Sequence, residues 1–470
     1  MKHLLRNRFD LKHALTLGLI ATLTACGGGG GGGGGFLPII PVTPPPPPAP
    51  ATYNVGGTVT GLIGDGLVLQ NNGGDDLPIA ADGTFTFSAQ VAKGANYAVT
   101  VKSQSRILTR VCTVSDGSGT VADAAVANVA VTCAAPPARF AYVPSQLTNT
   151  VTGFNIDAAS GVLTAIAAPA VGAGSQPIFT AVHPTGRFAY VMNIGSSTLS
   201  NFTIDTTTGA LSAMAVPTVT TSPNPVALAV EPTGRFLYVI TQAQITIFAI
   251  DQTTGALSDT GKPFVLTSPL SPQLLTIDPL GRFILAVSAV DSEILPLAIN
   301  QTTGELTASG APTALTGPIQ GIFVDPMGRF AYMPNPLGNT IAMFSINAAN
   351  GALTPLSVPT ITTSNPVTLL TVAPSGRFVY VADSFNGKVD TYALDPASGV
   401  LSSAPVSSIA VGGNPQFVTV DPAGRFAYVQ DVIGTTGLGF KIDATSGALT
   451  PMSTPSIPLP PGATLLVLSR

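Results

Sequence analysis

Charged residues are scarce in this sequence. Asp, Glu, Lys and Arg together make up 9% of the 470 residues, and the formal net charge is −4. Beyond the extreme N-terminus, no stretch concentrates lysine and arginine. Binding of nucleic acid depends on a concentrated basic face that can neutralise phosphates. The composition therefore excludes a nucleic-acid partner.

Histidine and cysteine are also rare. The chain has three of each and no tryptophan. So few potential ligands leave no His/Cys cluster for a transition metal, and the sequence contains neither a phosphate-binding loop nor a Ser-His-Asp set. We therefore expect no metal and no cofactor.

The N-terminus has the layout of an export signal. Residues 1–25 combine a basic start with an apolar run of about a dozen residues, which is too short to cross a bilayer core of ~30 Å. The run ends in LTAC, which resembles the lipobox of bacterial lipoproteins, and this resemblance implies that Cys26 is lipidated and anchors the protein in a membrane. Because Gly27 follows the cysteine, the resemblance implies the outer membrane, on its periplasmic or surface side. The alternative is an ordinary signal peptide with an unrelated cysteine.

Residues 26–52 are rich in glycine and proline. Nine glycines, Gly27 to Gly35, precede a run of prolines. Polyglycine behaves as flexible coil and polyproline as a stiff, extended spacer, so this segment is interpreted as a tether. A PxxP ligand for a partner domain is the alternative.

Residues 53–134 contain short β-prone runs separated by Gly, Asn and Asp. This pattern predicts a small β-sandwich of about seven strands. Cys112 and Cys133 both fall here, and in a protein exported from the cytoplasm we expect them to form a disulfide.

The remainder, residues 138–470, is built of repeats. The motif Arg-Phe-x-Tyr/Leu recurs every 47 or 48 residues, and an Asx-x-x-x-Gly-x-Leu motif keeps step with it. The arginines that begin the first motif are Arg139, Arg187, Arg235, Arg282, Arg329, Arg377 and Arg425. A period of this length is typical of propellers and solenoids.

Each repeat is predicted to form four antiparallel strands, A to D, and seven such units predict an all-β, seven-bladed β-propeller. The first repeat lacks strand A, whereas the last residues, ATLLVLSR, match strand A of other repeats such as VTLLTV. We therefore expect the C-terminal strand to complete the first blade and close the ring, leaving no open edge.

The text PTGRFAYV…ID…TGAL at this period resembles the lactonase-type seven-bladed propellers, the family of 6-phosphogluconolactonase and carboxymuconate cyclase. The resemblance covers residues 138–470 and implies lactone hydrolysis, with His, Arg or acidic groups on the inner strands. Here the inner strands read PIFTAV, PVALAV, PQLLTI and PQFVTV, which carry no basic residue. Hydrolysis would need both a base and a donor for the oxyanion.

His183 precedes the proline of an A–B turn, at a position where sister repeats carry mostly Asp or Glu. It is therefore interpreted as a turn-capping partner of Arg187 and not as a catalyst. The seven motif arginines are structural for a similar reason, because an active site occupies one place whereas these residues occur in every repeat.

The end of the channel where strands A begin and strands B end is called the mouth below. Polar residues gather there, and Asp383 and Asp431 stand where other repeats carry neutral groups. This break in symmetry makes the mouth the predicted ligand site, with these two aspartates as weak catalytic candidates. Capping of loops by Asx residues is the alternative. The mouth candidates are Asn193, Asn224, Asn335, Asn365, Asp383, Asn414 and Asp431.

Two functions remain open. The first is a monomeric, lipid-anchored protein of the cell envelope whose propeller serves as a binding or scaffold module for a protein or carbohydrate ligand. The second is a lactonase-type hydrolase acting on a sugar lactone, as in 6-phosphogluconolactonases.

Overall fold

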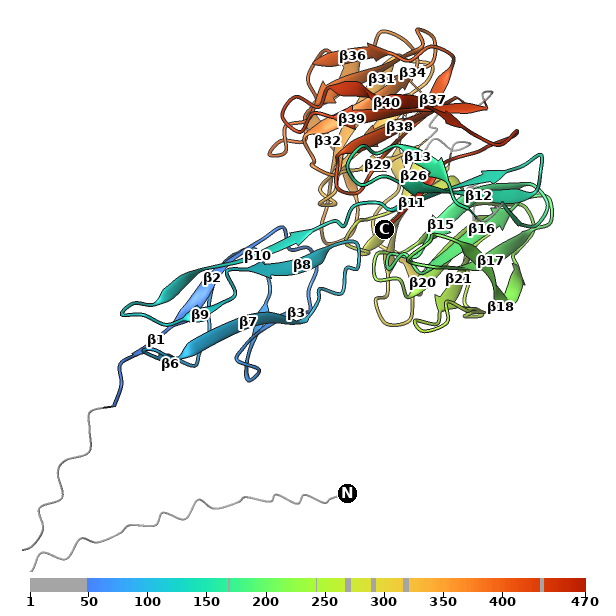
Figure 1. Ribbon diagram of the computed structural model, residues 1–470. Coiled ribbons are helices and arrows are strands. Elements are labelled where there is room, and N and C mark those ends of the chain that lie inside the picture. The colour runs from blue at the N-terminus through green and yellow to red at the C-terminus, as the bar shows by residue number, and fades with distance from the viewer. Residues whose placement is uncertain are drawn as a thin grey trace, which may run out of the picture. The chain divides into compact units, whose positions relative to one another are not determined.

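All regular structure in the described residues is β-strand (Figure 1). The computed structural model describes residues 49–470 except 168–169, 242, 267–271, 289–292, 316–320, 368 and 432–434. The predicted signal peptide, Cys26 and most of the tether lie outside the described residues. Within them, no helix is long and apolar enough to cross a membrane.

Residues 52–134 form two four-stranded sheets and a short two-stranded one. The first sheet has the order β5-β2-β10-β8 and the second β4-β3-β7-β9, while β1 pairs with β6. Their bounds are β1 Thr52–Tyr53, β2 Val55–Thr60, β3 Leu67–Asn71, β4 Asp75–Ile79, β5 Gly83–Thr86, β6 Val91–Ala92, β7 Asn96–Ser103, β8 Val111–Ser115, β9 Ser118–Thr120 and β10 Val126–Ala134.

Inward-facing residues of both four-stranded sheets share one apolar core that includes Val59, Leu69 and Val131. The β10–β2 pair is parallel, whereas the other pairs of these sheets are antiparallel. Cys112 and Cys133 face each other across the antiparallel β8–β10 pair and form the expected disulfide.

Residues 140–469 form seven further sheets, the blades of the propeller. Blade 1 contains β41 (Val467–Ser469), β11 (Phe140–Ser145), β12 (Thr150–Ile156), β13 (Leu163–Ala165) and β14 (Val171–Gly172). Blade 2 contains β15 (Pro177–Val182), β16 (Phe188–Asn193), β17 (Thr198–Ile204) and β18 (Leu211–Thr220). Blade 3 contains β19 (Pro225–Val230), β20 (Phe236–Thr241), β21 (Gln244–Ile250), β22 (Leu257–Asp259) and β23 (Phe264–Val265).

The other four blades repeat this plan. Blade 4 contains β24 (Pro272–Ile277), β25 (Phe283–Ser288), β26 (Glu293–Ile299), β27 (Leu306–Ala308) and β28 (Thr313–Ala314). Blade 5 contains β29 (Phe323–Val324), β30 (Phe330–Asn335), β31 (Thr340–Ile346) and β32 (Leu353–Thr362). Blade 6 contains β33 (Leu370–Val372), β34 (Phe378–Asp383), β35 (Lys388–Ala393) and β36 (Ser407–Ala410), and blade 7 contains β37 (Pro415–Val420), β38 (Phe426–Asp431), β39 (Thr436–Ile442) and β40 (Leu449–Pro458).

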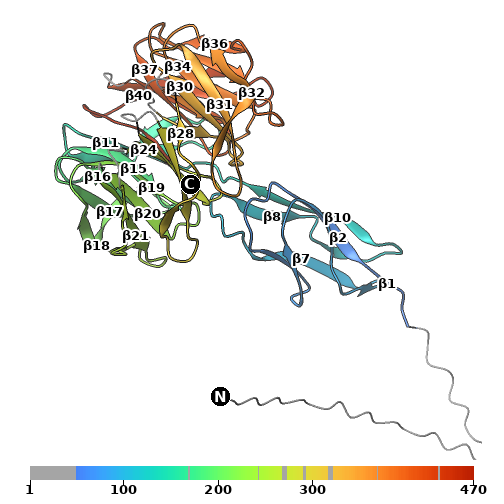
Figure 2. The same cartoon turned by 180° about the vertical axis from the view of Figure 1, so that it is seen from behind.

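The ring closes as the sequence predicts. Strand β41 pairs antiparallel with β11, with Phe140 opposite Ser469 and Tyr142 opposite Val467. The last strand of the chain is therefore strand A of the first blade, and Figure 2 shows the C-terminal end among the blades. The seven-bladed, all-β prediction is confirmed.

The repeated motifs hold neighbouring blades together. The tyrosine of strand B is fully buried and donates a hydrogen bond to the glycine carbonyl in the next blade's C–D turn, as Tyr142 does to Gly209 at 2.8 Å and Tyr332 to Gly399 at 2.9 Å. Burial raises the pKa of these tyrosines, so their hydroxyls stay protonated donors. Blade 4 has Leu285 in the tyrosine's place.

The motif arginine and phenylalanine act at the same junctions. Each arginine lies over the ring of the phenylalanine that follows it, at 4.8 to 5.6 Å from the ring centroid. That ring packs against the glycine of the next C–D turn, where a Cβ on Gly209 would come within 2.3 Å of Phe140. The predicted structural role of the motifs therefore has a direct explanation in the packing.

Candidate functional site

At the mouth, the candidates at the ends of strands B cap the B–C turns. Oδ1 of Asn335 accepts hydrogen bonds from the backbone N–H groups of Leu337 and Gly338 at 3.1 and 3.0 Å. Asn193 instead donates through Nδ2 to the Oγ of Ser200 at 3.0 Å. These contacts belong to the loop-capping alternative, which needs no ligand.

Two of the candidates that precede strands A join this arrangement within their own blades, whereas Asn224 of blade 3 contacts blade 2. Asn365 donates through Nδ2 to Oδ2 of Asp383 at 3.0 Å, and the backbone N–H of Asn414 donates to Oδ2 of Asp431 at 3.0 Å. Asn224 has a positive φ of 55° and donates its backbone N–H to the Oγ of Ser197. The structure therefore brings four of the predicted residues together as two contacting pairs, in the adjacent blades 6 and 7.

Blade 6 gathers charge at the mouth. Nζ of Lys388 lies 3.0 Å from Oδ2 of Asp390 and 3.7 Å from Oδ2 of Asp383, and both carboxylates are almost fully buried. Ser408 donates its hydroxyl to Asp390. We call Asp383, Lys388 and Asp390 the blade 6 cluster.

Lys388 and Asp390 were not among the residues predicted from the sequence. A signal for them was nevertheless present, because strand C of blade 2 carries Thr198 and Ser200 at the equivalent places. Both residues lie on strand C of blade 6, whereas the predicted mouth residues lie at the ends of strands A and B.

Asp383 is held as an anion. Burial alone raises its pKa, but hydrogen bonds from Asn365 and Asn386 and the charge of Lys388 together bring the pKa below its usual value. Its Oδ1 also accepts the backbone N–H groups of Phe385 and Asn386. A carboxylate with this many donors is a weak base, which suits it to positioning Lys388. Asp431, the equivalent residue of blade 7, is more exposed.

His183 lies at the opposite end of the channel, in an A–B turn, and is 1% exposed. Its Nε2 is 2.9 Å from the carbonyl oxygen of Gly234 in the next blade, and the backbone N–H of Thr185 donates to Nδ1. These partners place the proton on Nε2. The histidine caps its own turn as predicted, but the predicted pairing with Arg187 is wrong. An imidazole that donates to Gly234 reaches the next blade, whereas Arg187 extends to the carbonyl of Thr253.

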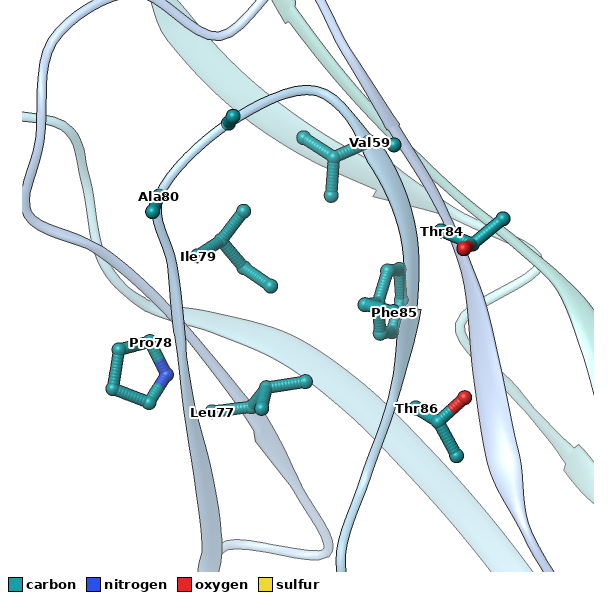
Figure 3. Close-up of a pocket in the computed structure, with 10 residues that line it drawn as sticks. Val59, Leu77, Pro78, Ile79, Ala80, Thr84, Phe85 and Thr86 are labelled. Carbon is teal, nitrogen blue, oxygen red and sulfur yellow. The ribbon is translucent and has the colours of Figure 1, made fainter.

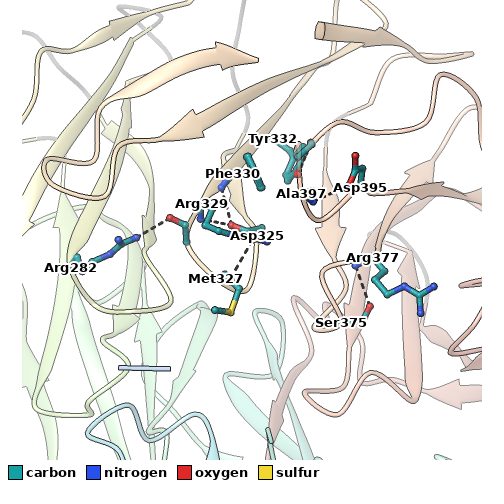
Figure 4. A network of polar contacts seen from close by, with 12 residues as sticks. Arg282, Asp325, Met327, Arg329, Phe330, Tyr332, Ser375, Arg377, Asp395 and Ala397 are labelled. Carbon is teal, nitrogen blue, oxygen red and sulfur yellow. Dashed lines mark hydrogen bonds and ion pairs between the residues drawn. The ribbon is translucent and has the colours of Figure 1, made fainter. Parts of the chain in front are cut away.

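Four of the sister turns carry an acid in this place, and the turn of blade 6 carries Ala373. Asp325 accepts the backbone N–H of Phe330 at 2.8 Å and pairs with the guanidinium of Arg329 at 3.3 Å (Figure 4). Asp278 pairs with Arg282 at 2.8 Å, and Arg282 also donates to the carbonyl of Gly328 in the following blade. These two arginines therefore stabilise the A–B turns of their own blades, and they do not converge on one site.

The described residues line several hollows, among them one of about 550 Å³ between Arg187, Asp205 and Thr253 and the two that follow. A small one of about 230 Å³ lies in the N-terminal sheets, where Val59, Leu77, Ile79 and Phe85 line the space between two strands (Figure 3). A larger one of about 710 Å³ lies at the A–B turns, at the opposite end of the channel from the mouth. Among the described residues, no group of three or more His, Cys, Asp or Glu side chains is placed to hold a metal ion.

The fold and the mouth define a closed, seven-bladed propeller with a cluster of charged residues in blade 6. The family model described as "Lactonase, 7-bladed beta-propeller" matches residues 70–323 and 312–465. These spans cover more than half of the chain, and the chain belongs to this lactonase family.

Solved structures show the same fold. A candidate 6-phosphogluconolactonase from Bacteroides fragilis is 19% identical, with a TM-score of 0.59 over 70% of this chain and 98% of that chain. The periplasmic gluconolactonase of Pseudomonas aeruginosa is also 19% identical, with a TM-score of 0.57 over 70% of this chain and 99% of that chain. At these identities the likeness establishes the fold and not the reaction. No curated protein matches the sequence.

Proposed function

We propose that the propeller hydrolyses a small sugar lactone and that the reaction takes place at the mouth, beside blades 6 and 7. Membership of the lactonase family supports the reaction class, and the named lactonases among the similar structures support the substrate class. The blade 6 cluster is the observation that supports this location, because it is a buried charged group where the equivalent residues of blade 2 are uncharged.

The proposed chemistry is addition of water to the lactone carbonyl. A base removes a proton from water as its oxygen bonds to the acyl carbon, the bond from that carbon to the ring oxygen breaks, and the ring oxygen takes up a proton. We assign the base to Asp431, which is more exposed than Asp383. Lys388, held by Asp383 and Asp390, would supply positive charge toward the developing oxyanion.

The test is hydrolysis of gluconolactone and 6-phosphogluconolactone by the purified protein, with the spontaneous rate subtracted. Asp431→Asn should lower kcat/KM by on the order of a hundredfold, as expected for loss of a general base. Asp259→Asn is the matched control and should retain turnover, because it removes the same charge from an exposed acid of β22, the outer strand of blade 3. A rate no higher than the spontaneous one for both lactones would refute the proposal.

A second candidate is a binding or scaffold module without catalysis. Inner strands such as Pro177–Val182, Pro225–Val230 and Pro415–Val420 carry no ionisable side chain, and this favours it. Under this reading the mouth would bind a carbohydrate or protein ligand. Calorimetry that detects lactone binding without release of acid would favour this candidate over the hydrolase.

We also propose that the protein is anchored in the outer membrane through lipid on Cys26. The support is the order of basic start, apolar run and LTAC, followed by a glycine- and proline-rich tether. This placement would give the propeller access to solutes of the cell envelope.

A further inference from the structure

Six inner strands are followed by a proline at one equivalent place. In each case the proline comes two residues after the last residue of the strand, as Pro184 follows Val182 and Pro422 follows Val420. The six are Pro184, Pro232, Pro279, Pro326, Pro374 and Pro422. The six apolar side chains encircle the A–B-turn end of the channel, and we call this set the proline ring.

The seventh place of the proline ring holds an arginine. Leu468 of β41 is opposite Ala141, just as Val420 of β37 is opposite Ala427. Two residues beyond Val420 is Pro422, and two residues beyond Leu468 is Arg470. The sevenfold repeat is therefore broken here by one guanidinium, at the opposite end of the channel from Asp383 and Asp431.

This end of the channel contains the cavity of about 710 Å³. Its lining includes every member of the proline ring, Arg470, and Arg110 from the N-terminal sheets. A volume of this size is typical of sites for small organic ligands, which are mostly apolar with a few polar groups that fix orientation. His183 also lines it, but both of its ring nitrogens are already within hydrogen-bonding distance of protein atoms.

The two arginines bring positive charge to the cavity, and both donate hydrogen bonds to backbone carbonyls. Nη1 of Arg470 donates to the backbone carbonyl of Leu108 at 3.1 Å, and Nη1 of Arg110 donates to the carbonyl of Gly61 at 3.0 Å. In residues 49–470, apart from the gaps given above, neither guanidinium forms an ion pair with a carboxylate side chain. Burial lowers the pKa of both, although the charge of Asp82 acts in the other direction on Arg110.

A guanidinium stays protonated at any pH at which the protein is folded, so partial burial leaves its charge in place. A buried charge is unfavourable unless it is paired. An anion entering the cavity would pair it, because a carboxylate or a tetrahedral oxyanion can accept two hydrogen bonds from one guanidinium.

We propose that the cavity at the proline ring binds a small organic anion with an apolar body. Its carboxylate or sulfonate would lie against Arg470 and Arg110, and its apolar part against the proline ring. This site shares no residue with the mouth, so it stands or falls independently of lactone hydrolysis.

The test uses two fluorescent dyes on the purified full chain. Anilinonaphthalene sulfonate has an apolar body and an anionic group, and phenylnaphthylamine has a similar body without the charge. The variants are Arg470→Met, Arg470→Lys and Ala423→Phe, which places a bulky ring at an exposed position of the cavity lining. Arg377→Met is the matched control, because Arg377 is exposed, does not line the cavity and carries the same charge.

We expect one saturable site for the sulfonate. Arg470→Met should weaken its binding on the order of tenfold, as expected for loss of a charge-assisted hydrogen bond, while Arg470→Lys restores part of it and Arg377→Met changes it less than about twofold. Ala423→Phe should weaken both dyes, and Arg470→Met should leave the neutral dye unaffected.

Absence of a saturable site would overturn the proposal. So would sulfonate affinity that is the same in Arg470→Met, Ala423→Phe and the unmodified protein. Melting temperatures of all variants are measured alongside. Should Arg470→Met fail to fold, Ala423→Phe and Arg470→Lys decide the question with the positive charge intact.

Discussion

The hydroxyl of Tyr428 donates a hydrogen bond of 2.7 Å to the carbonyl of Gly161, which lies 267 residues earlier in the chain. The same bond joins Tyr190 to Gly255 at 2.8 Å, between blades that are neighbours in sequence. The junction of the last blade with the first is therefore built like those inside the ring.

This equivalence predicts the cost of removing either hydroxyl. Tyr428→Phe leaves a buried carbonyl without its partner and should lower the free energy of unfolding by about 1–3 kcal/mol. Tyr238→Phe, which breaks the bond to Gly304 inside the ring, should cost a similar amount. Urea-induced unfolding measures both. If Tyr428→Phe has no effect while Tyr238→Phe does, blades 7 and 1 do not pack in solution.

The glycines of the C–D turns should tolerate no side chain. Gly161 has a φ of +79°, and a Cβ there would lie 2.5 Å from the ring of Phe426. Gly161→Ala should therefore destabilise by about 3 kcal/mol, through backbone strain and overpacking together. Gly424→Ala is the control, since its φ is +70° with nothing within 4 Å of the added carbon, and it should cost about 1 kcal/mol. Equal losses would mean that the Phe426 contact is unimportant.

His183 should make stability depend on pH. Burial lowers its pKa below the usual value despite the hydrogen bond to Gly234, so the unfolded chain binds a proton that the folded protein does not. The free energy of unfolding should therefore be highest above a pH of about 6.5, the pKa of an unperturbed histidine, and should fall as the pH drops below that value. Denaturation at several pH values should show this decline, and His183→Asn should flatten it.

The same substitution tests whether His183 has any role in catalysis. Because the imidazole lies in an A–B turn, at the end of the channel away from the mouth, lactone turnover by His183→Asn should match that of the unmodified protein. A large loss of kcat with unchanged folding would contradict the structural role.

The disulfide should stabilise the N-terminal sheets. Cys112 and Cys133 are 21 residues apart, and closing a loop of that length contributes about 3 kcal/mol in the chain-entropy account. Reducing agent should lower the melting temperature of the unmodified protein. The double variant Cys112→Ser, Cys133→Ser should melt at the lower temperature with or without reductant, and a response to reductant in that variant would point to another cause.

The lipid anchor is tested at Cys26. Cys26→Ala should abolish labelling by a fatty-acid analogue and release the protein from the membrane fraction of cells, because one side chain carries the proposed attachment. Cys112→Ser is the control for loss of a cysteine and should keep the label. Label that persists in Cys26→Ala would show that the lipobox interpretation is wrong.

The propeller could be predicted because its determinants are local and repeated. Each Arg-Phe-x-Tyr and Asx-x-x-x-Gly motif specifies a turn and a buried strand within one repeat, and the missing first strand with its counterpart at Leu468 indicates closure. The contacts that these motifs make were not predictable in the same way. Nothing in the sequence of one repeat indicates that its tyrosine donates a hydrogen bond to the glycine carbonyl of the following repeat.

The candidate site was predictable only in part. Comparison of repeats located Asp383 and Asp431, whose pairing with Asn365 and Asn414 the structure then shows. Lys388 and Asp390 were missed because strand C was not compared. The partner of His183 was assigned wrongly because Arg187 is near in sequence, whereas the imidazole reaches across to the next blade.

By itself, the sequence determined the fold class, the number of blades and the disulfide, since periodicity and turn residues act over short distances along the chain. Only the tertiary structure decided which groups meet, because side chains far apart in sequence come together through ring closure. Arg470 illustrates the difference. In the sequence it is an arginine after a short strand, and only the pairing of β41 with β11 places it in the ring of prolines, beside the cavity that they line.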